Sequence, residues 1–258
     1  MQDYTDEFYR DRHAATRRSA ERIVPLVLDL VRPRSVVDVG CGVGTWLSTF
    51  QQHGVADIQG YEGEWLDPRQ LIVPSAAVTL CDLQRPLESS RRFDLALSLE
   101  VAEHLPADCA SGFIASLTRL APVVLFSAAP PGQGGTHHVN EQWPPYWIEM
   151  FAAQRFEAVD CIRDRTWDDD GVLWWYRQNS FLFASRERLG EDDRLRAARE
   201  RPPSFPLRAL HPGLLQSRIA AQTRERQEIP PLRDSARAFV RSLRAAVARR
   251  LGRERART

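Results

Sequence analysis

The chain has 258 residues and contains no lysine, so arginine supplies all 35 of its basic side chains. This bias points to the base composition of a genome rather than to a function. The formal net charge is only +1, which argues against a global field for nucleic acid or membranes. Long apolar runs are also missing, since none approaches the ~18 residues of a membrane span. The charged segment MQDYTDEFYRDRH lacks an apolar stretch, so we expect no signal peptide.

Cysteine is scarce and scattered. The four thiols lie far apart and include no CxxC pair, a spacing that fits a reduced, cytoplasmic compartment better than a disulfide framework. Apolar residues make up 43% of the chain and charged residues 27%, which are ordinary values for a globular protein. The length suits one large α/β domain, or one such domain with an appendage.

Short apolar runs alternate with helical patterns along most of the chain, after a first helical pattern over 14–31. We expect seven strands, at 35–39, at a segment ending near 61, and at 76–83, 93–99, 122–130, 155–164 and 179–185. Strands that alternate with helices form parallel sheets covered on both faces. The pattern therefore predicts a doubly wound, seven-stranded Rossmann-like sheet, mostly parallel with an antiparallel edge strand.

The last quarter of the chain has a different character. After about Gly190 it becomes charged and is punctuated by proline, so we expect a first domain over 1–189 and an arginine-rich helical extension over 190–258. Apolar residues between Leu232 and Leu251 fall on one helical stripe. This helix would pack on the body or on a partner such as a second copy, or else contact an anionic membrane or polyanion.

The segment VVDVGCGVGTWL carries the most specific motif. A strand delivers Asp38 to its carboxyl end, and glycines follow at 40, 42 and 44 before a helix begins. Glycine lets a ligand approach the backbone without meeting a Cβ atom, and a helix N-terminus favours negative charge. The third glycine comes one residue too early for the GxGxxG dinucleotide loop, and the GK[ST] ending of a P-loop is missing.

This strand and loop resemble motif I of the class I S-adenosylmethionine-dependent methyltransferases, and GYEGE, CDL and FDLALSLEVAEHLP resemble later pieces of that family in order, over about residues 20–185. The resemblance implies that Glu62 binds the ribose hydroxyls, with Glu64 as its rival, and that Asp82 caps the adenine amino group. The cofactor-binding residues that it implies are Asp38, Gly40, Cys41, Gly42, Gly44, Thr45, Trp46, Glu62, Asp82, Leu83 and Leu99.

Two glutamates and a histidine, Glu100, Glu103 and His104, follow the fourth expected strand in SLEVAEHL. If this stretch opens a helix, the three side chains share one face. Ligands bind at the carboxyl ends of strands in open α/β sheets, so we expect the trio to face the cleft. The segment GGTHHVNEQWPPYW follows the fifth strand and brings His137 and His138 to the same rim.

The ExxEH pattern with a later histidine resembles the divalent-metal site of ubiquinone-pathway O-methyltransferases and of small-RNA terminal ribose 2′-O-methyltransferases. It implies that the ligands of an Mg²⁺, Mn²⁺, Fe²⁺ or Zn²⁺ ion are Glu100, Glu103, His104 and His138. The spacing to Glu141 favours His138, whereas the ubiquinone-type GTH pattern would favour His137. Without a metal, His104 or His138 could act as a general base, or the trio could be helix-start acids beside a buried histidine. Glu103, His104 and His138 are the expected catalytic residues.

The segment TWDDDGVLWWYRQN places Trp167, Trp174, Trp175 and Tyr176 before the last strand, as core anchors or as a substrate platform. With NEQWPPYW it resembles methyltransferases of polysaccharide and glycoside biosynthesis. We therefore expect an S-adenosylmethionine-dependent O-methyltransferase that acts on a hydroxyl of a saccharide or a related small polar metabolite. The alternatives are an RNA ribose 2′-O-methyltransferase, against which the neutral charge argues, and a non-catalytic S-adenosylmethionine-binding regulatory or assembly subunit.

Overall fold

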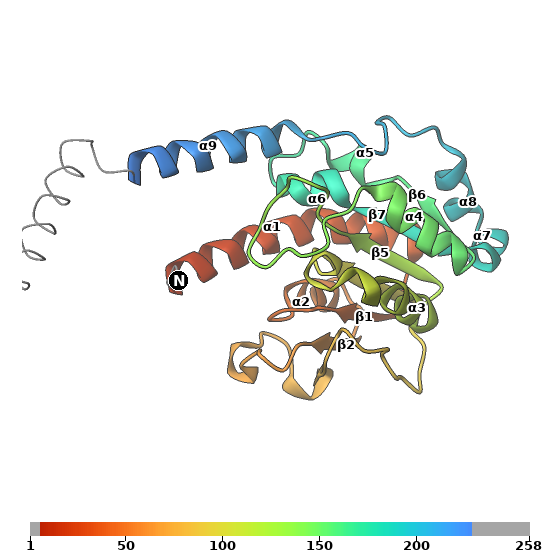
Figure 1. The fold of residues 1–258 in the computed structure, drawn as a ribbon. Coiled ribbons are helices and arrows are strands. Elements are labelled where there is room, and N and C mark those ends of the chain that lie inside the picture. Colours follow the sequence, from red (N-terminus) through yellow and green to blue (C-terminus); the bar gives the residue numbers. More distant parts are fainter. Residues whose placement is uncertain (1–5, 229–258) are drawn as a thin grey trace, which may run out of the picture. The chain divides into compact units, whose positions relative to one another are not determined.

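A computed structural model describes residues 6–228 of the chain, which divides into two compact units, Met1–Leu214 and Leu215–Thr258. The first unit contains a seven-stranded sheet and the helices around it (Figure 1). The strands are β1 (Ser35–Val39), β2 (Asp57–Glu62), β3 (Val78–Leu80), β4 (Leu95–Leu99), β5 (Val123–Ser127), β6 (Phe156–Val159) and β7 (Phe181–Ser185). The α-helices are α1 (Asp6–Val31), α2 (Thr45–Gln52), α3 (Ala110–Leu120), α4 (Pro144–Ala153), α5 (Ile162–Thr166), α6 (Trp174–Asn179), α7 (Arg186–Glu191), α8 (Asp193–Glu200) and α9 (Pro212–Glu228).

The strand order is β3-β2-β1-β4-β5-β7-β6. Successive strands are therefore added on one side of β1 up to β3 and on the other side from β4 onward. The pairs among β1 to β5 are parallel, whereas β7 runs antiparallel to both β5 and β6. Antiparallel pairing is thus confined to the edge formed by β7 and β6. The predicted Rossmann-like architecture, mostly parallel with an antiparallel edge, is confirmed.

Each face of the sheet buries its own apolar core, because successive side chains of a strand point to opposite faces. In β4, Leu95 and Leu97 lie in the core under α1 and α2, while Ala96 lies in the core under α3 and α4. Both faces of the central strands are therefore apolar, which explains the continuous hydrophobic runs that identified them in the sequence. None of the helices described here is long and apolar enough to cross a membrane.

The first unit continues well past the strands. The boundary expected after residue 189 falls inside it, because α7 and α8 fold back on the body and Leu195 of α8 is fully buried in the core under α1. A segment beyond α8 is also attached, since the backbone N–H of His211 donates to the side chain of Gln178. The apolar stripe expected between 232 and 251 lies outside the described residues.

Candidate active site

The glycine-rich loop joins the end of β1 to α2, and its three glycines have positive φ angles. A Cβ atom on Gly40 would collide with Val101, and one on Gly44 would collide with Val73. These two positions therefore need glycine for packing. Gly42 differs, because a Cβ atom there would meet nothing within 4 Å among the described atoms. Its bare backbone faces open space, as a ligand-cradling position requires.

The carboxylate of Glu62 closes this loop from the end of β2. Oε2 of Glu62 accepts a 2.6 Å hydrogen bond from the N–H of Gly42, and Oε1 accepts one of 2.7 Å from the N–H of Gly63. Burial raises the pKa of Glu62, and these two N–H donors oppose the shift. Glu64 is exposed, so the structure places Glu62, and not its rival, at the loop.

Asp38, the last acidic residue before the glycines, is almost completely buried on β1. Burial raises its pKa to about 8, and the negative charge of Glu62 adds to the shift. Among the described residues, Oδ2 of Asp38 has no hydrogen-bond partner. The two carboxyl groups of this loop thus differ, since one is partnered by backbone amides and the other is held in an environment that favours its neutral form.

The other expected cofactor residues lie in different environments. Cys41, Trp46, Leu83 and Leu99 are buried apolar residues of the two cores. Oγ1 of Thr45 lies 2.8 Å from Nδ1 of His13, a contact from α1 that no motif in the sequence indicated. Asp82 is exposed after β3, where its carboxylate accepts from the N–H of Gln84 and pairs with Arg85.

The trio after β4 is not on an α-helix, so the shared helical face expected from its spacing was wrong. Glu100 bends the chain with φ 57°, Ala102–His104 forms a single 3-10 turn, and α3 begins only at Ala110. Proline at 106 explains why the 3-10 turn does not continue into α3, because the residue before a proline is disfavoured in the α conformation and Leu105 is extended.

Tertiary contacts nevertheless bring part of the trio together with the loop after β5. One carboxylate oxygen of Glu103 and one ring nitrogen each of His104 and His138 lie within 4.8 Å of one another. The two imidazole rings meet edge to face with centroids 4.8 Å apart, and Nε2 of His138 lies 4.0 Å from Oε1 of Glu103. His137 is exposed and has a positive φ of 61°. The structure therefore places His138, and not His137, beside Glu103.

Glu103 is fully buried, and neither of its carboxylate oxygens has a hydrogen-bond partner among the described residues. Burial raises its pKa well above the usual range and the negative charge of Glu100 adds to this effect, while the nearby backbone N–H groups of Glu103 and Ala129 oppose it without reaching hydrogen-bond geometry. A buried carboxylate without partners is costly unless a cation or a proton neutralises it. The position of Glu103 beside two imidazoles is therefore suited to a cation.

Glu141 fixes the orientation of His138. Its Oε1 lies 2.9 Å from Nδ1 of that ring, and its two oxygens also accept hydrogen bonds from the N–H groups of Gly132 and Gly134. Although burial opposes it, these hydrogen bonds lower the pKa of Glu141. An ionised Glu141 favours the tautomer of His138 that carries its proton on Nδ1, which leaves a lone pair on Nε2 toward Glu103. Gly135 is also required here, because a Cβ atom on it would collide with this ring.

Glu100, the fourth ligand implied by the resemblance, lies outside this group. Its Oε1 accepts a 3.1 Å hydrogen bond from Nδ2 of Asn179, and its Oε2 accepts one of 2.6 Å from Nε2 of Gln133. Burial raises the pKa of Glu100 although these donors oppose it. Neither amide partner was indicated by a pattern in the sequence.

The aromatic residues between β6 and β7 pack mainly on other parts of the protein. Tyr176 is buried and meets Trp46 edge to face with ring centroids 5.3 Å apart. Trp167 stacks on Phe205 with centroids 4.1 Å apart. These contacts favour the core-anchor interpretation for Trp167 and Tyr176, while Trp174 and Trp175 are half-buried.

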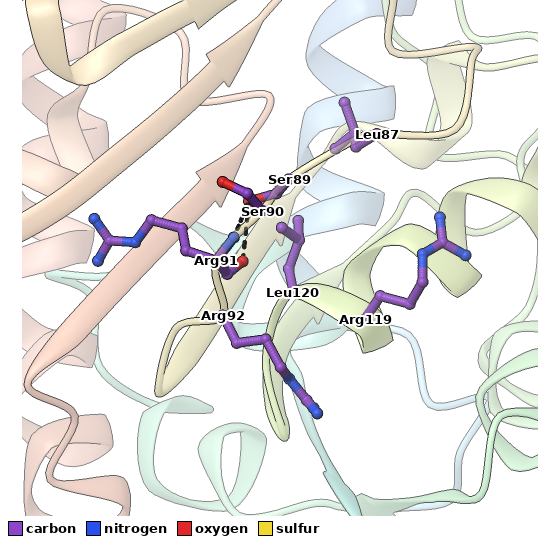
Figure 2. A pocket seen from close by; sticks show the side chains of 7 residues that line it. All are labelled: Leu87, Ser89, Ser90, Arg91, Arg92, Arg119 and Leu120. Atoms are coloured by element: carbon purple, nitrogen blue, oxygen red, sulfur yellow. Dashed lines mark hydrogen bonds between the residues drawn. The ribbon is translucent and has the colours of Figure 1, made fainter.

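A small surface pocket lies elsewhere, before β4 and at the end of α3 (Figure 2). The lining residues are Leu87, Ser89, Ser90, Arg91, Arg92, Arg119 and Leu120. These residues precede β4 and β5, whereas the glycine loop and Glu103 follow the carboxyl ends of β1 and β4. The pocket is therefore at the opposite edge of the sheet from the candidate active site.

Comparison with known proteins agrees with this geometry. No curated protein sequence matches the chain. Among solved structures, the sugar N-methyltransferase KedS8 from Streptoalloteichus sp. ATCC 53650 is 18% identical with a TM-score of 0.53, over 70% of this chain and 92% of that one. CalS10, an amino pentose methyltransferase from Micromonospora echinaspora, is 14% identical with a TM-score of 0.51, over 71% and 99% of the two chains. At such low identity these likenesses show the fold alone.

The family is shown by sequence. A family model described as a methyltransferase domain matches residues 10–179, which is more than half of the chain. The matched region contains the glycine loop, Glu62, Glu103 and His138, and it ends at Asn179. The chain therefore belongs to the family of methyltransferase domains, and its family and fold support methyl transfer that depends on S-adenosylmethionine.

Proposed function

We propose that the protein transfers a methyl group from S-adenosylmethionine to a hydroxyl of a saccharide or a related small polar metabolite, with a divalent cation bound by Glu103, His104 and His138. The observation that carries the proposal is the buried carboxylate of Glu103, which has no hydrogen-bond partner among the described residues and lies beside two imidazoles. The similarity to KedS8, a sugar N-methyltransferase, and to CalS10, an amino pentose methyltransferase, supports a sugar as the class of acceptor.

The residues present fit a divalent cation. One carboxylate and two imidazoles form a mixed oxygen and nitrogen donor set, which suits Mn²⁺, Fe²⁺ or Zn²⁺ and, less well, Mg²⁺. Each ring needs a free lone pair, and the contact between Glu141 and Nδ1 of His138 provides one at Nε2. When bound, such a cation would lower the pKa of an acceptor hydroxyl and orient it.

The chain's own residues divide the remaining work. Gly42 leaves the backbone open for the methyl donor, while Glu62 holds the loop in shape. Transfer to a hydroxyl forms a C–O bond and breaks the C–S bond, whose electron pair stays on sulfur, and it releases the hydroxyl proton. With the cation held by Glu103, His104 and His138, that proton passes to water; without the cation, His104 or His138 would act as the general base beside Glu103.

The proposal can be tested with labelled S-adenosylmethionine and a panel of hydroxylated and aminated sugars. The enzyme would be chelated and dialysed first, and Mg²⁺, Mn²⁺, Zn²⁺ or Fe²⁺ would then be added back singly. We expect Glu103→Ala to abolish metal-dependent turnover and to leave the calorimetric affinity for S-adenosylhomocysteine nearly unchanged. Glu149→Ala, at an exposed position of α4, serves as the matched control. Full activity after chelation would exclude the metal, and methylation of amino groups alone would exclude O-methyl transfer.

A further inference from the structure

Glu100 belongs to a closed ring of three side chains at the edge of the candidate active site. Besides its bond to Glu100, Nδ2 of Asn179 donates a 2.8 Å hydrogen bond to Oε1 of Gln133. Both carboxylate oxygens of Glu100 thus accept from amides, and the two amides are also bonded to each other. The ring joins the end of β4, the loop after β5 and the end of α6, which are far apart in the sequence.

Donors and acceptors alternate along this network in one order only, because it starts at a backbone N–H, that of His211, and finishes at a carboxylate, that of Glu100. The backbone N–H of His211 can only donate, and it donates a 2.7 Å hydrogen bond to Oε1 of Gln178. The amino group of Gln178 must then face Oδ1 of Asn179, 2.9 Å away, which turns the amino group of Asn179 toward Glu100. Glu100 receives only donors, so its position requires a group with two acceptors, and a carboxylate satisfies this.

The network also reaches the loop that carries His138. Gln133 belongs to the loop whose next residues carry His138 and Glu141, and the N–H groups on either side of it, from Gly132 and Gly134, donate to Glu141. The backbone of Glu100 is itself fixed, because its N–H lies 3.0 Å from the carbonyl oxygen of Ser127 and 3.1 Å from its hydroxyl. A non-glycine residue with φ 57° persists only where its surroundings determine it.

We propose that Glu100 is a positioning residue and not a metal ligand: through Gln133 and Asn179 it holds the His138 loop and α6 in place relative to the end of β4. This inference rests on the proposed function of that site, and it assigns Glu100 a role different from the one that its place in the ExxEH pattern implies. The carboxylate makes two charge-assisted hydrogen bonds, one to Gln133 of the loop and one to Asn179 of α6, and such bonds are stronger than neutral ones.

The test exchanges the carboxylate and the amide between positions 100 and 133. Glu100→Gln replaces one acceptor oxygen by a donor, so one bond to an amide is lost. Gln133→Glu places a second carboxylate beside the first. In the double variant Glu100→Gln with Gln133→Glu, the carboxylate at 133 accepts from both amides, and the amide at 100 accepts from Asn179, so the ring is complete again. Glu88→Gln, an exposed residue before β4, is the matched control.

Two measurements decide the proposal without an acceptor. Hydrogen exchange of the bonded amides of Gly132, Gly134, Val139 and Asn140 reports on the loop, and calorimetry reports on Mn²⁺ alone. We expect about tenfold faster exchange in each single variant, weaker Mn²⁺ binding in Glu100→Gln, and recovery of both in the double variant. Affinity for S-adenosylhomocysteine should stay at the wild-type value throughout.

Two outcomes would overturn the proposal. Exchange that is unchanged in Glu100→Gln would show that the carboxylate does not hold the loop. Exchange that recovers in the double variant while Mn²⁺ affinity does not would make Glu100 a direct ligand. If the wild-type protein binds no Mn²⁺, the metal part of the proposed function fails, whereas the exchange rates still decide whether Glu100 positions the loop.

Discussion

The backbone N–H of Gly42 donates a 2.6 Å hydrogen bond to Oε2 of Glu62, and this contact joins the glycine loop of β1 to the end of β2. Because the other oxygen of Glu62 accepts from the N–H of Gly63, one side chain fixes the backbone on both strand ends. The loop and the acidic residue therefore act together, although 20 residues separate them in the sequence.

Glu62→Gln should weaken cofactor binding. Glutamine offers one acceptor oxygen where Glu62 uses two, so a backbone N–H loses its partner and the negative charge is removed. A charge-assisted hydrogen bond contributes about 1.5–3 kcal/mol, which corresponds to a roughly tenfold or larger loss of affinity for S-adenosylhomocysteine by calorimetry. Glu64→Gln, at the exposed neighbouring acid, should bind as the wild type does. The assignment to Glu62 fails if the two variants bind equally well.

Gly42→Ala should separate ligand binding from backbone strain. Its control is Gly54→Ala, because Gly54 also has a positive φ, of 93°, and a Cβ atom at that position would likewise meet nothing within 4 Å among the described atoms. Both variants should lose a similar amount of stability, about 1–2 kcal/mol, from the left-handed conformation. Only Gly42→Ala should lose affinity for S-adenosylhomocysteine. Equal affinities in the two variants would place the cofactor elsewhere.

Asp38 should make the protein less stable as the pH rises. Its pKa is raised from 3.8 to about 8, so the folded state binds more protons than the unfolded state between these values. The stabilisation is fully present below pH 3.8 and is lost as the pH rises to about 8, at up to about 1.4 kcal/mol per pH unit. Urea unfolding of the ligand-free protein at several pH values measures this slope. Asp38→Asn should flatten it, and a slope equal to that of the wild type would contradict the burial argument.

Truncation should locate the end of the first compact unit. A chain ending after Leu214 keeps Leu195 in the core and keeps the bond from His211 to Gln178, so we expect it to unfold near the wild-type temperature and to bind S-adenosylhomocysteine. A chain ending after Gly190 loses both, and it should unfold at a clearly lower temperature. Equal melting temperatures for the two chains would move the boundary back toward residue 189.

Local patterns in the sequence predicted much of the secondary structure of this protein. The strand over 35–39 was predicted with its observed bounds, and a helix was predicted after the glycines, where α2 begins at Thr45, because an apolar run and closely spaced glycines are local signals. The Rossmann-like sheet follows from the alternation of such elements, whereas the methyltransferase family was indicated by the resemblance of the glycine loop and the segments after it. The choices of Glu62 over Glu64 and of His138 over His137 could rest only on motif spacing, since spacing along the chain does not say which side chain is buried.

Tertiary structure decided the rest. The bond from Asn179 to Glu100 spans 79 residues, and the one from Gln133 spans 33, so no local pattern could indicate them. The left-handed conformation of Glu100 separates it from the 3-10 turn that carries Glu103, and Leu195 was drawn into the core from beyond the expected boundary. The sequence determines which chemical groups are present near each strand end, whereas the long-range packing of loops determines which of them meet, because contact energies depend on distances that only the folded chain sets.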